Sequence, residues 1–179
     1  MPQIWILLVR GVNVGGANRL PMADFRALLT GLGLDEVQTW IQSGNAVFRS
    51  ALAAQALERM IGDAIAARFG FRPLLFLRTL VQIESILAAD PFAGHDGAPT
   101  TRHVFVLAQP APEADLAALR DLVRGEDFAL TDAALYLSAP HGIGRSALVA
   151  ALPRFLKVAT TARNLKTLGT IAALARSLG

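Results

Sequence analysis

Arg10-Gly11-Val12-Asn13-Val14-Gly15-Gly16 is the stretch that decides the fold of this chain, together with the shorter stretch Gln42-Ser43-Gly44-Asn45. The first follows a continuous apolar run, residues 4–9, which is typical of a β-strand buried on both faces. The second separates an alternating run, residues 37–41, from an apolar run at 46–48, so it predicts a β-hairpin. Glycine and asparagine tolerate positive φ, so both stretches are expected to turn sharply.

Outward from these turns, the first 78 residues predict a ferredoxin-like unit. Apolar residues at helical spacing after Pro21 predict a helix that ends at Gly31 or Gly33. A second helix is expected over residues 52–69, and a strand over 74–77. The resulting order, β-α-β-β-α-β, is the ferredoxin-like one. Its first and third strands are antiparallel neighbours, so we expect the two turns to meet at one end of the sheet.

Residues 79–179 predict a second, related α+β subdomain. Their expected order is αβαββ followed by C-terminal helices, without a residue-level repeat of the first half. The fold class is therefore α+β, with two packed subdomains at 1–78 and 79–179. The elements expected in the second subdomain are helices at 80–89, 113–123, 146–152 and 164–178, and strands at 103–107, 128–130 and 135–137.

Composition excludes several classes of protein. Hydrophobic residues make up 53% of the 179 residues, which is typical of a folded core and not of a disordered chain. There is no cysteine, so no disulfide framework and no thiolate chemistry is expected. The chain lacks an apolar run of about 20 residues, and its start lacks the basic region of a signal peptide. We therefore expect a soluble cytoplasmic protein with no membrane partner.

Charge is distributed unevenly along the chain. Residues 133–179 contain six cations and no carboxylate, whereas residues 24–132 contain all 14 acidic residues. A basic segment of this kind suits an anionic partner such as a phosphate, a nucleotide or a nucleic acid. The alternative is that these cations pair with the acidic middle of the same protein. The charge pattern leaves both interpretations open.

The two turns supply the main candidate binding site, at the end of the sheet where the helix after Pro21 also begins. Hydrogen-bond donors gathered there suit a phosphate or a carboxylate. We expect these donors to come from Arg10, Asn13, Gly15, Gly16, Gln42, Ser43 and Asn45. A second contribution is expected from Arg145 in a glycine-rich turn, and from Arg163 and Asn164 before the last helix. The alternative is that these residues only shape and cap turns.

Common catalytic and cofactor motifs are missing from the sequence. The first turn lacks the Gly-Lys-Ser/Thr of a P-loop and the spacing of a dinucleotide-binding loop. Ser43 does not stand in a G-x-S-x-G elbow, and the three histidines do not have metal-ligand spacing. His103, at the start of an apolar strand, is expected to be structural. We predict no cofactor and no metal.

Residues 8–16 and 39–48, which include both turns, resemble the signature of the bacterial domain-of-unknown-function family 1697. The resemblance runs nearly end to end, and the pairing of Gly-Val-Asn-Val-Gly-Gly with Ile-Gln-Ser-Gly-Asn is specific. It implies two α+β subdomains, the first of them ferredoxin-like, and it implies no established activity. It rests on residues 8–16 and 39–48, and further on Phe69-Gly70, Arg78-Thr79, Pro91-Phe92 and Thr161-Ala162-Arg163-Asn164.

Three functions stay open from the sequence. The first is binding of a small anionic ligand or of nucleic-acid phosphates at the two turns. The second is an enzyme of unknown reaction that uses the same pocket, with Asp24 or Ser43 in the chemistry. The third is an interaction or oligomerisation module in which the polar turns are structural.

Overall fold

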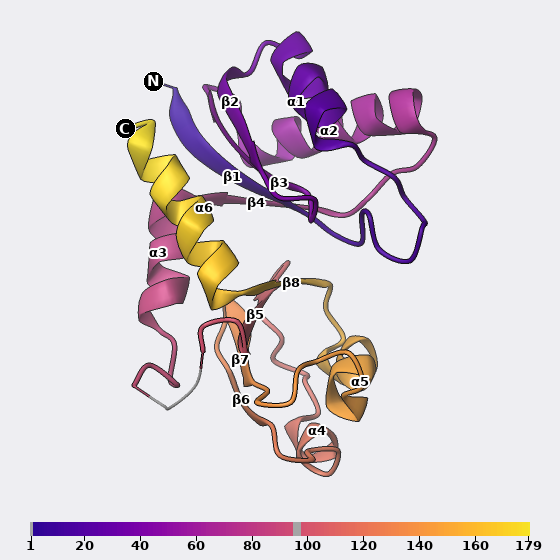
Figure 1. The fold of residues 1–179 in the computed structure, drawn as a ribbon, viewed down its shortest axis with the longest axis vertical. Helices are drawn as coiled ribbons and strands as arrows, with labels where there is room; N and C mark the ends of the chain where they lie inside the picture. The colour runs from indigo at the N-terminus through magenta and orange to yellow at the C-terminus, as the bar shows by residue number, and fades with distance from the viewer. Residues whose placement is uncertain (1, 95–97) are drawn as a thin grey trace. The chain divides into compact units, whose positions relative to one another are not determined.

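The computed structural model describes residues 2–94 and 98–179. Its elements follow the order β-α-β-β-α-β-α twice (Figure 1). The first series is β1 (Gln3–Val9), α1 (Met22–Gly31), β2 (Asp35–Trp40), β3 (Asn45–Ser50), α2 (Ala54–Phe69), β4 (Leu75–Thr79) and α3 (Leu80–Ala88). The second series is β5 (Arg102–Leu107), α4 (Leu116–Arg120), β6 (Asp127–Leu130), β7 (Ala134–Ser138), α5 (Ala147–Leu156), β8 (Thr160–Asn164) and α6 (Leu165–Ser177).

The chain divides into two compact units. Unit 1 consists of Met1–Ser85 with Gly169–Gly179, and unit 2 consists of Ile86–Leu168. The division therefore falls within α3 and again within α6. The subdomain boundary expected after residue 78 stays a prediction.

Unit 1 has the ferredoxin-like sheet, with the order β2-β3-β1-β4 and antiparallel pairing throughout. Because β1 is central, Leu7 pairs with Ala46 on one side and with Leu77 on the other. Helices α1 and α2 bury their apolar faces on this sheet, with Phe25 and Ile61 fully buried. The continuous apolar run of β1 is explained by this central position, and the predicted fold class is confirmed.

Unit 2 repeats this topology more completely than the sequence predicted. Its sheet order is β6-β7-β5-β8, and α4 and α5 pack their buried leucines against one face. The sequence predicts no strand at residues 160–164, where the structure has β8. Thr160-Thr161-Ala162-Arg163-Asn164 lacks the large apolar residues that mark a strand, and only its pairing with β5 reveals it. The helix expected at 113–123 is also shorter, at Leu116–Arg120.

The two series match at their last strands in residue detail. Arg78 of β4 pairs with Ile6, and Arg163 of β8 pairs with Val104, each one position before the strand ends. Each guanidinium donates from Nη1 to the carbonyl of the preceding residue, at 2.8 Å and 2.7 Å respectively. Burial lowers the pKa of both arginines, that of Arg163 to about 10.

The residue after each arginine caps the helix that follows. Thr79 accepts at Oγ1 from the Gln82 N–H at 3.2 Å, and Asn164 accepts at Oδ1 from the Thr167 N–H at 2.8 Å. Arginine followed by a capping residue is thus a structural repeat. It is hidden in the sequence because the caps differ in residue type.

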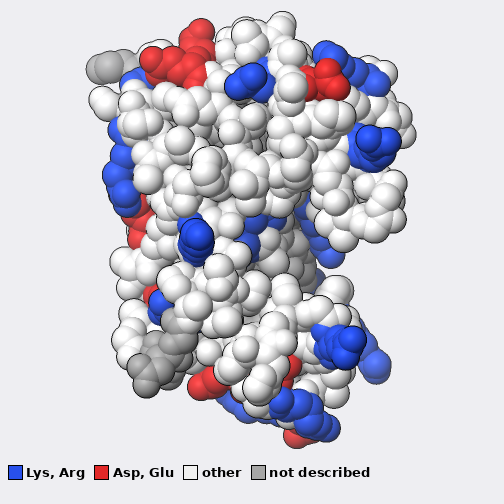
Figure 2. Space-filling model, viewed as in Figure 1, with Lys and Arg blue, Asp and Glu red and all other residues white. Residues whose placement is uncertain are grey.

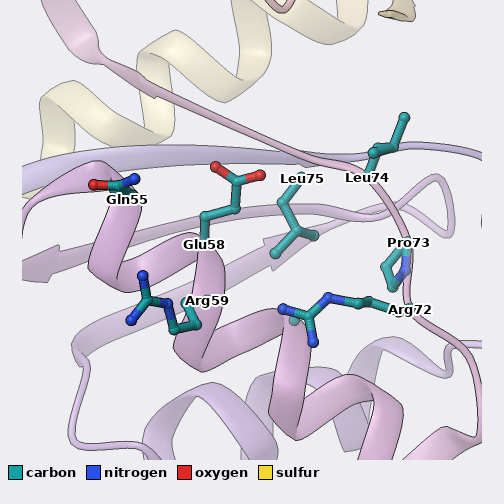
Figure 3. A pocket seen from close by; sticks show the side chains of 8 residues that line it. Gln55, Glu58, Arg59, Arg72, Pro73, Leu74 and Leu75 are labelled. Carbon is teal, nitrogen blue, oxygen red and sulfur yellow. The ribbon is translucent and has the colours of Figure 1, made fainter.

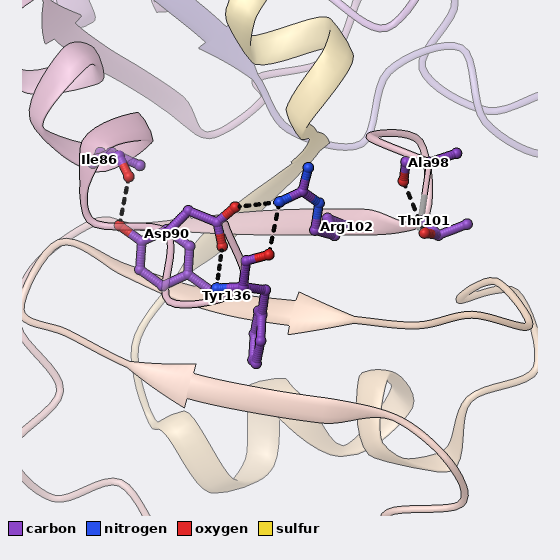
Figure 4. Close-up of polar contacts among 7 residues, drawn as sticks. Ile86, Asp90, Ala98, Thr101, Arg102 and Tyr136 are labelled. Carbon is purple, nitrogen blue, oxygen red and sulfur yellow. Dashed lines mark hydrogen bonds and ion pairs between the residues drawn. The ribbon is translucent and has the colours of Figure 1, made fainter. Parts of the chain in front are cut away.

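A buried polar cluster in unit 2 fixes the chain after α3 (Figure 4). The Asp90 carboxylate accepts from the Phe92 N–H and, at 3.0 Å, from Arg102. The Tyr136 hydroxyl donates to the Ile86 carbonyl at 2.7 Å, and burial raises the pKa of this phenol. These bonds pair the Asp90 carboxylate and the Tyr136 hydroxyl, which would be expensive to bury alone, although the buried Nε of Arg102 has no hydrogen-bond partner among the described residues. We therefore assign the cluster a structural role.

His103 makes the stability of the protein depend on pH. Burial lowers the pKa of this imidazole, because the charged form is disfavoured in the folded state. The unfolded chain therefore binds more protons below about pH 6.5, and stability is lost as the pH falls through that value. We expect urea unfolding to give a lower free energy at pH 5.5 than at pH 7.5. His103→Gln should reduce that difference, whereas His141→Gln, at an exposed position, should not.

Candidate functional site

One end of the unit 1 sheet carries the candidate site. Strands β1 and β2 end there, and β3 and β4 begin there, because each neighbouring pair is antiparallel. Three connecting segments consequently meet at this end: residues 10–21, 41–44 and 70–74. The Arg10 N–H donates to the Leu74 carbonyl at 3.0 Å, and the Val9 N–H donates to the Gly44 carbonyl at 2.8 Å.

Asn13 joins the two turns that the sequence singled out. Its Nδ2 donates to the Leu20 carbonyl at 2.9 Å and to the Gln42 carbonyl at 2.7 Å. Its Oδ1 accepts from the Leu20 N–H at 2.8 Å. Both amide hydrogens are engaged within the loop and the turn, so ligand binding by this side chain stays a prediction that these contacts do not favour.

The tip of the first loop is a tight turn at Gly15-Gly16. Both glycines have positive φ, at 60° and 80°, the pattern of a type I′ turn. Val14 and Ala17 bridge across the turn, and Val14 is 70% exposed. The glycines therefore shape the loop, and they also leave its backbone accessible at the site.

The second turn is built on close packing at Gly44. A Cβ added there would lie 2.6 Å from Val12 Cγ2 and 2.9 Å from Val9 Cβ, and the residue has a φ of 74°. The fully buried Asn45 donates from Nδ2 to the Trp40 carbonyl at 3.0 Å and to Ser43 Oγ at 2.8 Å. Asn45 and Ser43 thus hold the turn together.

A cavity of about 520 Å³ lies where the two turns meet, lined by Asn13, Gly16, Arg19 and Gln42. Three of these residues were sequence candidates, and Arg19 was not. Arg19 is exposed and has no hydrogen bond or ion pair to the described residues. The sequence offers one indication of Arg19: it is a cation in a loop, residues 10–21, that contains no acidic residue. Arg10 is half-buried and stands outside the cavity lining.

This end of unit 1 is basic, and the equivalent end of unit 2 is acidic. The three segments in unit 1 contain Arg10, Arg19 and Arg72 and no carboxylate. The equivalent segments of unit 2, residues 108–115, 131–133 and 157–159, contain three carboxylates and one lysine. The basic character is thus specific to unit 1 and does not follow from the topology. On the face shown in Figure 2, basic side chains form separate groups with no continuous basic surface.

Arg145 lies in unit 2, in the turn before α5. The neighbouring Ser146 caps α5 by accepting from the Val149 N–H at 3.2 Å, and its hydroxyl donates to the Glu126 carboxylate. This hydrogen bond holds the pKa of Glu126 below its usual range. The Ser146 hydroxyl next to Arg145 is therefore already bonded to the Glu126 carboxylate. Anion binding by Arg145 stays a prediction.

Arg163 and Asn164 lie on β8 and have structural partners. Arg163 is 8% exposed and donates from Nη1 to Thr161 Oγ1 at 3.1 Å as well as to the Ala162 carbonyl. Asn164 caps α6. Their contribution to a ligand site stays a prediction that these contacts do not favour.

Two further hollows have mixed charge. A groove of about 340 Å³ runs between α2 and the start of β4 (Figure 3). Arg72, which lines it, lies against Gly62 of α2 and pairs with Asp63. Glu58 and Arg59 also line it. A hollow of about 240 Å³ in unit 2 includes Glu113 and Lys157 in its lining. Of the three hollows, only the one at the two turns is lined by a cation without a carboxylate.

Comparisons with known proteins concern the fold and the family. A family model described as "Protein of unknown function (DUF1697)" matches residues 3–136. The chain is similar to a solved structure, the conserved bacterial protein SP0830 from Streptococcus pneumoniae, with 26% identity and a TM-score of 0.73. That similarity covers 98% of this chain and 99% of the other. No curated protein matches the chain. Separately, within residues 2–94 and 98–179 no helix has the length and apolar character needed to cross a membrane.

Substitution of Gly44 tests the packing of the second turn. We expect Gly44→Ala to destabilise the protein by about 2–4 kcal/mol, because backbone strain at positive φ adds to the overlap with Val9 and Val12. The control is Gly142→Ala, which has a φ of 81° and open space at Cβ. Gly142→Ala should lower the free energy of unfolding by only about 1 kcal/mol, because it adds backbone strain without steric overlap. Equal losses in thermal or urea unfolding would contradict the packing argument.

Proposed function

The chain belongs to the DUF1697 family, whose description assigns no activity, and we propose from the geometry that unit 1 binds a small anionic ligand or nucleic-acid phosphates. The proposed site is the cavity between the two turns. One observation carries the proposal: the exposed Arg19 lines this cavity, and the three segments around it contain no carboxylate. An anion there would be attracted by Arg19, and the carboxylate that follows in the first turn of α1, Asp24, is paired with Arg68.

The cavity residues divide into binding and positioning roles. Arg19 is the main binding group, because a guanidinium presents two parallel N–H donors to a phosphate or carboxylate. The exposed amide of Gln42 and the backbone at Gly16 add neutral donors. Asn13, Ser43 and Asn45 act as positioning residues, since their side chains bond within the turns.

The enzyme alternative receives less support than binding. The Asp24 carboxylate lies 3.3 Å from Arg68 on α2, and Ser43 Oγ accepts from Asn45. Neither residue lines the cavity. An activated nucleophile needs a base that accepts its proton. Here the Asp24 carboxylate pairs with Arg68, and the Ser43 hydroxyl accepts from the Asn45 amide.

Substitution of Arg19 tests the proposed site. We expect Arg19→Ala to weaken binding of inorganic triphosphate and of a fluorescein-labelled 12-residue oligothymidylate by about 10- to 100-fold, as for a charge-assisted hydrogen bond. Calorimetry and fluorescence anisotropy measure the two affinities. If the oligonucleotide is bound through its phosphates, its affinity should also fall with salt as counterions are released.

The matched control is Arg26→Ala, which removes an exposed arginine of α1 that has no hydrogen bond or ion pair to the described residues. It should bind both probes as the unmodified protein does. Equal weakening by the two substitutions would show that net charge alone matters. Absence of binding to either probe, with a mass that depends on concentration, would favour the interaction module instead.

A further inference from the structure

The outer side of β4 presents a defined set of backbone groups. The strand order places β4 at one edge of the unit 1 sheet. The Arg10 N–H donates to the Leu74 carbonyl, and hydrogen-bonded pairs alternate along an antiparallel ladder, so Phe76 and Arg78 also bond to β1. The backbone groups that point away from β1 are consequently those of Leu75, Leu77 and Thr79.

Three features close most of this edge. Arg78 donates from Nη1 to the outward carbonyl of Leu77 at 2.8 Å. The outward N–H of Thr79 donates to Gln82 Oε1 at 2.9 Å. Pro73, two residues before the strand, stands at the preceding outward position and has no N–H to offer. A strand added to β4 would therefore meet few outward groups that are able to pair with it.

The edge strand β8 of unit 2 has the same arrangement. The Ala108 N–H donates to the Ala159 carbonyl at 2.9 Å, so the same alternation turns the Ala162 carbonyl away from β5. Arg163 donates from Nη1 to that carbonyl at 2.7 Å and is only 8% exposed. The equivalent arginine thus covers the equivalent carbonyl, although the two strands otherwise differ in sequence.

The other two edge strands are protected by different means. β2 begins with Asp35 and Glu36, its register shifts between Asp35 and Gln38, and Glu36 has a φ of 52°. β6 is four residues long and begins with Asp127. Charges, bulges and short length all disfavour strand addition. β4 and β8 contain no carboxylate and have a continuous register, so they lack these devices.

We infer that Arg78 and Arg163 close the edges of β4 and β8 against strand addition, and that the partner excluded at β4 is a second copy of this chain. An open sheet edge is a template for pairing with another chain. The run Leu74-Leu75-Phe76-Leu77 is apolar and uncharged. Such a segment pairs favourably with an identical segment of a second molecule.

Arg78 decides which pairings of two β4 strands are possible. Two copies related by a twofold axis would pair their outward residues in antiparallel fashion. With the axis at Phe76 or Leu77, the Leu77 carbonyl must accept from the other strand, and Arg78 already occupies it. With the axis at Leu75, Leu77 lies opposite the partner's Pro73, which cannot donate. Removing the Arg78 donor therefore opens pairings that the unmodified chain lacks.

Arg78→Met tests this inference, because it removes the donors and keeps an unbranched side chain. We expect the dimer association constant of the full chain, measured by sedimentation velocity over a range of concentrations, to rise about tenfold or more. Arg26→Met removes the same charge from an exposed position of α1 and should behave as the unmodified protein does. Arg78→Lys should do so too, because a lysine on an edge strand opposes strand addition.

Two further measurements locate the association and separate it from instability. The N–H groups of Leu75 and Leu77 gain partners only when two β4 strands pair. Their hydrogen exchange, followed by NMR, should therefore slow about tenfold or more in associated Arg78→Met. Ile61→Val loosens a fully buried position of α2 without changing the edge. It should not associate when the two variants are compared in urea at equal free energy of unfolding.

Each outcome supports or overturns the inference. Association of Arg78→Met with slowed exchange at both leucines, absent from Ile61→Val, would support it. A monomeric Arg78→Met, association equal to that of Ile61→Val, or association without slowed exchange would overturn it. If Arg78→Met fails to fold, Arg163→Met is compared in the same way. The outward N–H groups of Thr160 and Ala162 then report on pairing through β8.

Discussion

The structure of unit 1 depends on the close approach of its two turns. Gly44 lies so near Val9 and Val12 that no side chain fits at that position, and the Asn13 amide bonds to the Gln42 carbonyl across the gap. These contacts connect the segment that leaves β1 with the segment that enters β3. The Asn13 side chain also bonds to Leu20, just before α1, so the same contacts hold the start of α1 and two of the residues that line the cavity, Asn13 and Gln42.

The internal repeat gives this site a natural comparison. Both units share one strand order and place the same kinds of connection at the same end of the sheet. In unit 1 that end has an open cavity lined by Arg19, which has no ion pair to the described residues, whereas in unit 2 it contains Glu113, Asp115 and Asp132 with Lys157. Asp115 caps α4 by accepting from the Ala118 N–H. The two ends therefore suit different partners, although the backbone arrangement is shared.

The arginines of this chain differ in role according to where the fold places them. Arg78 and Arg163 end equivalent strands, and burial lowers their pKa values because the charged form is disfavoured away from water. Their positions favour a structural role for these two arginines over a role in ligand binding. Arg19 has the opposite environment, exposed and without a bonded neighbour among the described residues. A count of cations along the sequence does not distinguish these cases.

The sequence by itself determined most of the first unit. The apolar run of β1, the glycine and asparagine turns and the helical spacing after Pro21 are local signals, and local signals report local backbone preferences. Together with the ferredoxin-like order they predicted the contact between the two turns. Tertiary structure alone decided the rest. β8 forms because β5 offers a partner, although Thr161 and Arg163 give no apolar pattern. Tertiary structure also decided the hydrogen bonds of Asn13 and the place of Arg19 in the cavity lining, since hydrogen-bond partners and exposure depend on segments distant in the sequence.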